Sequence, residues 1–191
     1  MLRLILVTTA IWMMSVPAAA MQVKACDMYM NFETSSEARQ WRAINDGVMG
    51  GRSLGGPRFE NGQMVFQGVI NTNGGGFSSI RSPVRSGALA EASGMKLRLR
   101  SDGRAYKLNL RSNASWRGRR VSFQAAIPRT NVGEWAEVVV PFSELRGTMF
   151  GRRVLGAVFD KSAVVEMGII LADGQDGPFR LDVDWIADCG L

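Results

Sequence analysis

Two aspartates on one predicted strand come closest to a catalytic pair in this sequence. Asp182 and Asp184 alternate with apolar residues in the segment 179–186, so both carboxyl groups project from the same strand face. Paired carboxyl groups are what most glycoside hydrolases use. An outer strand face exposed to solvent produces the same pattern, and we favour that interpretation. We expect the opposite face of the strand to enter the core through Phe179, Leu181, Val183 and Trp185.

The sequence contains no histidine, which removes the Ser-His-Asp triad, imidazole bases and the commonest metal ligand. The two cysteines, Cys26 and Cys189, stand at opposite ends of the chain, so we expect no zinc site. Asp173 and Asp176 could offer oxygen atoms to calcium, but turn formation alone accounts for them. We therefore predict no bound metal.

A glycine-rich segment, GVMGG at residues 47–51, resembles a phosphate-binding loop in composition only. Such a loop needs a strand before it and a helix after it within a βαβ unit. The pattern predicts neither element here, so we expect no nucleotide or other cofactor. We expect neither hydrolase nor dehydrogenase activity, and hence no enzyme.

The elements that position these residues are short and predominantly β-like. Alternating or β-branched segments predict strands at residues 27–32, 63–70, 77–81, 95–100, 106–111, 121–127, 134–140, 154–159, 164–171 and 179–186. Turn residues separate these segments, for example at 55–57, and only residues 34–41 suggest a brief helix. The pattern predicts an all-β fold, an antiparallel β-sandwich.

The segments 95–100 and 106–111 flank Asp102-Gly103, a dipeptide that favours tight turns, and we predict a β-hairpin. Basic residues gather on its outward face and just beyond it: Arg98, Arg100, Lys107, Arg111, Arg117, Arg119 and Arg120. We favour a role in solubility for this cationic surface. As a binding surface it would attract an acidic protein, an anionic lipid or a polyanionic glycan, and we expect no nucleic acid.

The N-terminal segment and the composition indicate one exported domain. Residues 1–20 combine Arg3, an apolar run at 4–16 and small residues before Met21, which is the pattern of a cleaved signal peptide. The apolar run is shorter than the roughly 20 residues of a membrane-spanning helix, and the mature chain offers no other candidate span. With 46% hydrophobic residues in 191, we expect a single domain over 21–191, exported to the periplasm.

Export places the cysteines where disulfides persist. An even count and an oxidising compartment favour a bridge between Cys26 and Cys189 over two free thiols. The net charge of +6 also permits an anionic partner or membrane surface without identifying one.

Two glycine-rich segments, 41–53 and 73–81, interleave turn residues and large apolar residues too densely for a plain helix or strand. Together with the segments 66–68, 97–106, 141–142 and 177–184, they resemble the family of complex I intermediate-associated protein 30. Members of that family include assembly factors of the respiratory NADH:ubiquinone oxidoreductase. The resemblance covers nearly all of the chain after its N-terminal segment.

The resemblance implies a galactose-binding-like jelly roll, whose first and last strands tend to be neighbours, and so it supports the bridge between the chain ends. It also implies a binding role rather than a chemical reaction. The candidate binding residues lie at motif positions: Trp41, Asn45, Asp46, Met49, Arg52, Ser53, Asn73, Phe77, Arg81, Arg104 and Tyr106. For Trp41, Met49 and Phe77 we favour packing in the core over exposure as anchors.

The leading functional hypothesis is a non-catalytic binding or assembly factor that acts through protein-protein contacts. The resemblance implies a protein partner, a membrane-associated respiratory complex. The alternative is a carbohydrate-binding module that holds a glycan with the end loops of the jelly roll.

Overall fold

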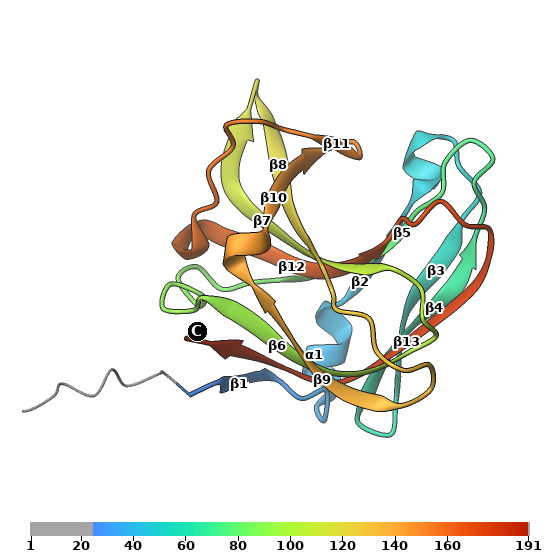
Figure 1. The fold of residues 1–191 in the computed structure, drawn as a ribbon, viewed down its shortest axis with the longest axis horizontal. Coiled ribbons are helices and arrows are strands. Elements are labelled where there is room, and N and C mark those ends of the chain that lie inside the picture. The colour runs from blue at the N-terminus through green and yellow to red at the C-terminus, as the bar shows by residue number, and fades with distance from the viewer. Residues whose placement is uncertain (1–24, 191) are drawn as a thin grey trace, which may run out of the picture.

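A computed structural model describes residues 25–190, which form two antiparallel β-sheets packed face to face (Figure 1). The six-stranded sheet has the order β3 (Leu54–Glu60), β4 (Gln63–Ile70), β13 (Gly177–Cys189), β6 (Gly94–Ser101) and β9 (Trp135–Pro141), with β1 (Asp27–Met30) also paired to β13. The seven-stranded sheet has the order β11 (Arg152–Arg153), β10 (Arg146–Met149), β8 (Arg119–Ala126), β7 (Tyr106–Trp116), β12 (Val164–Leu171), β5 (Ser78–Pro83) and β2 (Arg42–Asn45). The helical elements are α1 (Ser35–Gln40) and the 3-10 turns η1 (Asp46–Met49), η2 (Phe142–Glu144) and η3 (Lys161–Ala163). The predicted all-β antiparallel sandwich is confirmed, whereas the predicted leader lies outside the described residues.

The core lies between the two sheets and is filled by the apolar side chains that alternate along the strands. Its aromatic centre is a cluster in which the ring of Phe179 lies 4.8 Å from that of Phe66 and 6.5 Å from that of Tyr106. Leucines come from both sides, with Leu97 of β6 and Leu108 of β7 fully buried. Aromatic and branched side chains on facing sheets interdigitate in this way in β-sandwiches.

The predicted hairpin of 95–100 with 106–111 is wrong. β6 pairs with β13 and β9 in the six-stranded sheet, whereas β7 pairs with β8 and β12 in the other sheet. Both strands bury leucines in the same core, so they must face each other across it. The connection at Asp102 crosses between sheets, and the Asp102 carboxylate holds it by accepting a hydrogen bond from the Arg180 N–H at 2.7 Å.

Two other predictions fail at glycines. The predicted turn at 55–57 lies inside β3, an edge strand, where Pro57 is tolerated and Gly55 allows close packing. A Cβ atom on Gly55 would lie 2.4 Å from the Ser78 Oγ. Residues 154–159, predicted as a strand, form an irregular segment instead, with Gly156 at a φ of +80°.

The alternation predicted for the last strand breaks at a β-bulge between Val183 and Trp185. The extra residue reverses the side-chain alternation, because a bulge adds one residue to one strand only. Ile186 therefore enters the core, and Trp185 stays outside it, with the Lys96 ammonium 5.9 Å from its ring. The prediction of Trp185 as a core residue is wrong.

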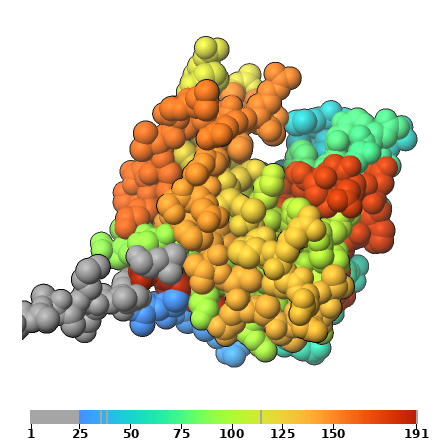
Figure 2. All heavy atoms as spheres, viewed as in Figure 1, coloured from blue at the N-terminus to red at the C-terminus, as the bar shows by residue number. Residues whose placement is uncertain are grey.

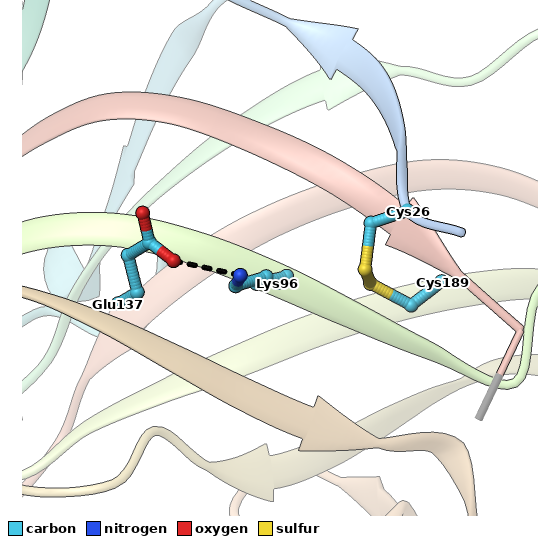
Figure 3. The surroundings of a disulfide bond; sticks show 4 residues. All are labelled: Cys26, Lys96, Glu137 and Cys189. Atoms are coloured by element: carbon cyan, nitrogen blue, oxygen red, sulfur yellow. Dashed lines mark ion pairs between the residues drawn. A yellow bond between two sulfur atoms is a disulfide. The ribbon is translucent and has the colours of Figure 1, made fainter.

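The two ends of the described chain meet at a disulfide bond. Asp27 of β1 pairs with Asp188 of β13, and this pairing brings Cys26 beside Cys189 with their Cα atoms 4.1 Å apart (Figure 3). The bridge closes a loop with a sequence separation of 163 residues. Among residues 25–190, no helix is long and apolar enough to cross a membrane.

Candidate functional site

The two glycine-rich motif segments meet at one buried carboxylate. Asp46 is fully buried and accepts hydrogen bonds from the Ser53 N–H at 2.8 Å, the Ser53 hydroxyl at 2.6 Å, the Gly76 N–H at 2.6 Å and the Phe77 N–H at 3.3 Å. Burial raises the pKa of Asp46, but the hydrogen bonds from Ser53, Gly76 and Phe77 outweigh it and hold the pKa below its usual value. The carboxylate is therefore a structural link between two loops, not a ligand-binding group.

Glycines let the backbone approach that carboxylate. A Cβ atom on Gly51 would lie 2.3 Å from the Asp46 Cγ, and one on Gly75 would lie 2.4 Å from the Asp46 Oδ2. Asn45 adds a second link, because its amide donates to the Gly55 carbonyl at 3.0 Å and its Oδ1 accepts from the Ser78 hydroxyl at 2.6 Å. The motif thus encodes a rigid loop pair, which we call the Asp46 loops (residues 45–53 and 72–77).

The Asp46 loops expose apolar side chains at their surface. Val48 is 76% exposed and Met49 is 54% exposed, both in η1. Leu54, which follows the first loop, is also exposed, as is its cross-strand partner Val69. The favoured prediction of Met49 as a core residue is therefore wrong, because its side chain is exposed.

The other candidates on these loops have different positions. Trp41 is a core residue, as favoured from the sequence, and its indole N–H donates to the Met30 sulfur at 3.1 Å. Phe77 is partly buried, whereas Arg52 and Asn73 are exposed. The structure brings Asn45, Asp46, Ser53 and Phe77 together, with Met49, Arg52 and Asn73 displayed on the surface around them.

Arg104 and Tyr106 belong to a second structural link at the crossing between the sheets. The Arg104 guanidinium binds both oxygens of Asp173, at 2.9 Å and 2.6 Å, and also donates to the Gly177 and Pro178 carbonyls. Hydrogen bonding to Asp173 raises the pKa of Arg104, and burial raises the pKa of the Tyr106 hydroxyl, which donates to Asp102 at 3.2 Å. Both residues are largely buried, so the prediction of an accessible polar surface is wrong for them.

The aspartates considered for catalysis or calcium are engaged by the protein itself. Asp182 is 2% exposed and accepts from the Arg100 Nε at 2.8 Å and its Nη2 at 2.6 Å, while Asp184 pairs closely with Arg98. The Asp173 carboxylate is held by Arg104, and Asp176 accepts from the Thr72 N–H at 2.6 Å. Within residues 25–190 no cluster of acidic or cysteine side chains is arranged to hold a metal ion.

Arg81 lies elsewhere, on the outer face of the seven-stranded sheet. Figure 2 shows a hollow above this sheet, between a yellow and orange lobe and a cyan and green lobe that contains the Asp46 loops. Polar residues of β5, β7 and β12 alternate with core residues along the strands under this hollow. We call the following residues the polar floor: Ser79, Arg81, Asn109, Arg111 and Glu166.

The polar floor carries a surplus of positive charge. Arg111 Nη1 donates to Glu166 at 3.1 Å, Arg81 Nη1 lies 3.9 Å from the same carboxylate, and Arg42 pairs closely with its other oxygen. Burial, with Arg111 nearby, lowers the pKa of Arg81. Three guanidinium groups around one carboxylate favour an anionic or strongly hydrogen-bonding ligand.

Several buried polar atoms of the floor have no hydrogen-bond partner among the described residues. These atoms are both amide atoms of Asn109, the Ser79 hydroxyl, and the Nε atoms of Arg81 and Arg111. Asn109 is 1% exposed, and Gly168 pairs with Arg81 on one side and Asn109 on the other. A Cβ atom on Gly168 would lie 2.1 Å from the Ile80 carbonyl oxygen, so glycine lets these strands approach closely. Unpaired buried polar groups are costly, so a ligand or water that paired them would be stabilised.

Sequence reasoning missed Asn109 and Glu166 as site residues. Both alternate with core residues in predicted strands, so they could be assigned to an outer face. Their convergence with Arg81 depends on β12 pairing between β5 and β7, strands distant in the sequence. No local pattern specifies that pairing.

The two packed sheets give this chain the β-sandwich fold of carbohydrate-binding modules. The family 11 carbohydrate-binding module of the cellulase Lic26A-Cel5E of Clostridium thermocellum superimposes with a TM-score of 0.65 and 14% identity, over 87% of this chain and 95% of that chain. The family 11 module from Clostridium thermocellum in complex with a β-1,3-1,4-mixed-linked tetrasaccharide gives a TM-score of 0.63 and 17% identity, over 86% of this chain and 95% of that chain. At these identities the likeness concerns the fold alone.

The family itself is defined by sequence. The model of the Complex I intermediate-associated protein 30 (CIA30) family matches residues 30–183, and the chain belongs to this family. The mitochondrial complex I intermediate-associated protein 30 of Mus musculus is 36% identical over 94 residues, which are 47% of this chain and 28% of the mouse protein. The match therefore spans only about a quarter of that relative's length. The family and the fold are of non-catalytic kinds.

Proposed function

We propose that this chain is a non-catalytic assembly-factor domain that holds a partner protein against the Asp46 loops. The observation that carries the proposal is the exposure of Val48 and Met49 on a loop whose backbone is fixed by the buried Asp46 carboxylate. A large apolar side chain on a preorganised loop can be buried by a partner with little loss of backbone entropy. Membership of the CIA30 family supports a role in assembling a protein complex.

The proposed partner is a membrane-associated respiratory complex or one of its subunits. The name of the mouse relative refers to an intermediate of complex I, and this supports the choice. The disulfide between Cys26 and Cys189 is consistent with an exported, periplasmic chain, so the contacted part of the partner would lie on the exported side of the membrane.

The proposal is tested by capture from detergent-solubilised membranes of the native host. Wild-type chain is compared with Val48→Ser plus Met49→Ser, and with the matched control Val132→Ser, which removes an exposed apolar side chain (68% exposed) outside the Asp46 loops. We expect the control to retain the partner and the double variant to lose it, because truncating a central apolar anchor commonly costs tenfold or more in affinity, about 1.4 kcal/mol. Equal capture by all three chains would refute a role for the Asp46 loops.

A second function, glycan binding, has its own supporting observation in the polar floor. The unpaired amide of Asn109 and the hydroxyl of Ser79 are groups that sugar hydroxyls can pair. The wild-type chain and Asn109→Ala are applied to a glycan array, where binding by the wild type that Asn109→Ala loses supports this function. The same substitution leaves Val48 and Met49 intact, so capture of a protein partner by Asn109→Ala assigns the two functions to different surfaces.

A further inference from the structure

Two tight β-turns form one end of the seven-stranded sheet. The turn between β7 and β8 has Arg117 and Gly118 at φ values of 51° and 74°, and the turn between β10 and β11 has Phe150 and Gly151 at 49° and 73°. Two successive positive φ values are typical of the two-residue turns that continue the twist of a hairpin. The Arg119 guanidinium lies 5.4 Å from the centre of the Phe150 ring and joins the two turns. We call residues 115–120 and 149–155 the paired tips.

The paired tips carry many positive charges and no negatively charged side chain. All the arginines at the tips are exposed: Arg117, Arg119, Arg120, Arg152 and Arg153. The segments 115–126 and 146–159 contain no aspartate or glutamate. None of these arginines takes part in an ion pair with another residue in the described part of the chain. The positive charge is thus left for an external anion.

Apolar side chains stand among these charges. Phe150 is 64% exposed and Leu155 is 77% exposed. They line a pocket together with Trp116, Met149, Arg152 and Arg153. Arg117 lies over the Trp116 ring, 4.3 Å from its centre, so charged and aromatic groups share one surface. Aromatic and aliphatic groups beside arginine are the composition of surfaces that lie in a lipid headgroup layer.

We propose that the paired tips dock onto an anionic phospholipid surface. The arginines contact lipid phosphates, and Phe150 and Leu155 enter the boundary between headgroups and acyl chains. An acidic protein would satisfy the charge, but the β7–β8 turn projects from the body of the sandwich (Figure 1), and the β10–β11 turn that Arg119 joins to it carries the exposed Phe150. A projecting apolar tip ringed by cations fits a lipid layer, into which it can insert. This proposal rests on residues outside the Asp46 loops and the polar floor.

Sedimentation with vesicles tests the proposal, using phosphatidylcholine alone and phosphatidylcholine mixed with phosphatidylglycerol. Wild type and variants carry the same N-terminus. If the apolar run at residues 4–16 is retained, it therefore contributes equally to vesicle binding in all of them. Arg152→Gln with Arg153→Gln should weaken binding to the anionic vesicles by roughly 25-fold, since each arginine near an anionic surface contributes about a factor of five. Phe150→Asn removes the ring and keeps a residue that tolerates positive φ, so weaker binding by this variant reports insertion rather than misfolding.

Arg58→Gln on β3 is the matched control, because it removes an exposed arginine from the other sheet. We expect it to bind as wild type does, and we expect wild-type binding to fall as salt is raised. Equal binding to both vesicle types, or full binding by the Arg152 and Arg153 variant, overturns the proposal. Binding to a soluble acidic protein without binding to anionic vesicles also overturns it and assigns the tips to a protein partner.

Discussion

The substitution Asp46→Asn should destabilise the domain strongly, although it changes neither the size nor the shape of the side chain. Asp46 Oδ1 accepts one donor, the Ser53 N–H, and Oδ2 accepts the Ser53 hydroxyl and the N–H groups of Gly76 and Phe77. An asparagine must place its NH2 group at one of these oxygens. The less costly orientation puts it at Oδ1, where it meets the Ser53 N–H, another donor.

The magnitude follows from these contacts. One hydrogen bond is lost and the buried Ser53 N–H is left unpaired, while three bonds change from a charged to a neutral acceptor. A hydrogen bond to a charged group contributes about 1.5 to 3 kcal/mol, and an unpaired buried donor costs about 1 to 3 kcal/mol. Because these contributions overlap, we expect the free energy of unfolding to fall by about 2 to 4 kcal/mol.

The same residue should make stability depend on pH in the acid range. The pKa of Asp46 is lowered in the folded state, so the unfolded chain binds the proton more readily than the folded chain does. The stabilisation by the carboxylate is therefore complete above the unfolded-state pKa of about 3.9 and is lost as pH falls through the lower folded-state pKa. The Asp46→Asn variant should lack this pH-dependent part of the free energy of unfolding.

Urea unfolding followed by tryptophan fluorescence, at neutral pH and at several acid pH values, measures both effects. Asp160→Asn is the control, because Asp160 is an exposed aspartate that also accepts hydrogen bonds, from Ser162. We expect the control to change stability much less than Asp46→Asn does. A change of less than about 0.5 kcal/mol for Asp46→Asn, the size of an ordinary surface substitution, would refute the assigned role of the carboxylate.

Three further predictions concern other parts of the molecule. Cys189→Ser should lower the free energy of unfolding by roughly 2 to 5 kcal/mol, because the bridge closes a long loop in the unfolded chain, and adding reductant should then leave the variant unaffected while destabilising the wild type. Arg104→Lys should cost about 2 kcal/mol in urea unfolding, since an ammonium group cannot bind both Asp173 oxygens and the neighbouring carbonyls at once, whereas Arg58→Lys should cost almost nothing. Mass spectrometry of the native protein should find Met21 as the first residue, and an intact Met1 in a cytosolic fraction would contradict the predicted export.

Local patterns predicted the strands well where one face is apolar and the other polar. The segments 63–70 and 164–171 match β4 and β12 as found, because alternation or β-branched content specifies a strand without reference to its neighbours. Sheet pairing is different, since it depends on contacts between residues distant in the sequence. The strands at 95–100 and 106–111 are correct as strands, but their leucines allow either a hairpin in one sheet or a crossing between two sheets.

The wrong predictions of a turn at residues 55–57 and of Trp185 in the core have a common physical origin. Gly55 and Gly56 suggest a turn by composition, but Gly55 is needed because the Ser78 and Phe179 side chains approach the strand closely. The bulge before Trp185 arises where β13 changes partners along one edge, from β4 to β1. Both features respond to tertiary neighbours, which no local composition reveals.

In the candidate site, too, local motifs single out residues, whereas the contacts of those residues depend on the fold. Asp46, Ser53 and Arg104 were predicted as binding residues from their motif positions, but in the structure their side chains bond to the protein's own backbone or to its own charged groups. A motif that fixes loop geometry identifies the family and the fold. It does not identify a partner, and we propose exposed residues such as Val48 and Met49 for that contact.

In the proposed function, Asp46 positions the loop and Met49 contacts the partner. A double-mutant cycle can test these two roles. If Asp46 acts only by holding Met49 in place, Asp46→Asn should weaken partner capture under conditions in which the domain stays folded, although Asp46 is fully buried. In a chain that already carries Met49→Ser, Asp46→Asn should then have little further effect, because the contact that it positions has gone. Residues that share one interaction show such non-additivity, whereas independent residues add within about 0.5 kcal/mol. Additive losses in capture would mean that the partner binds these loops through groups other than Met49.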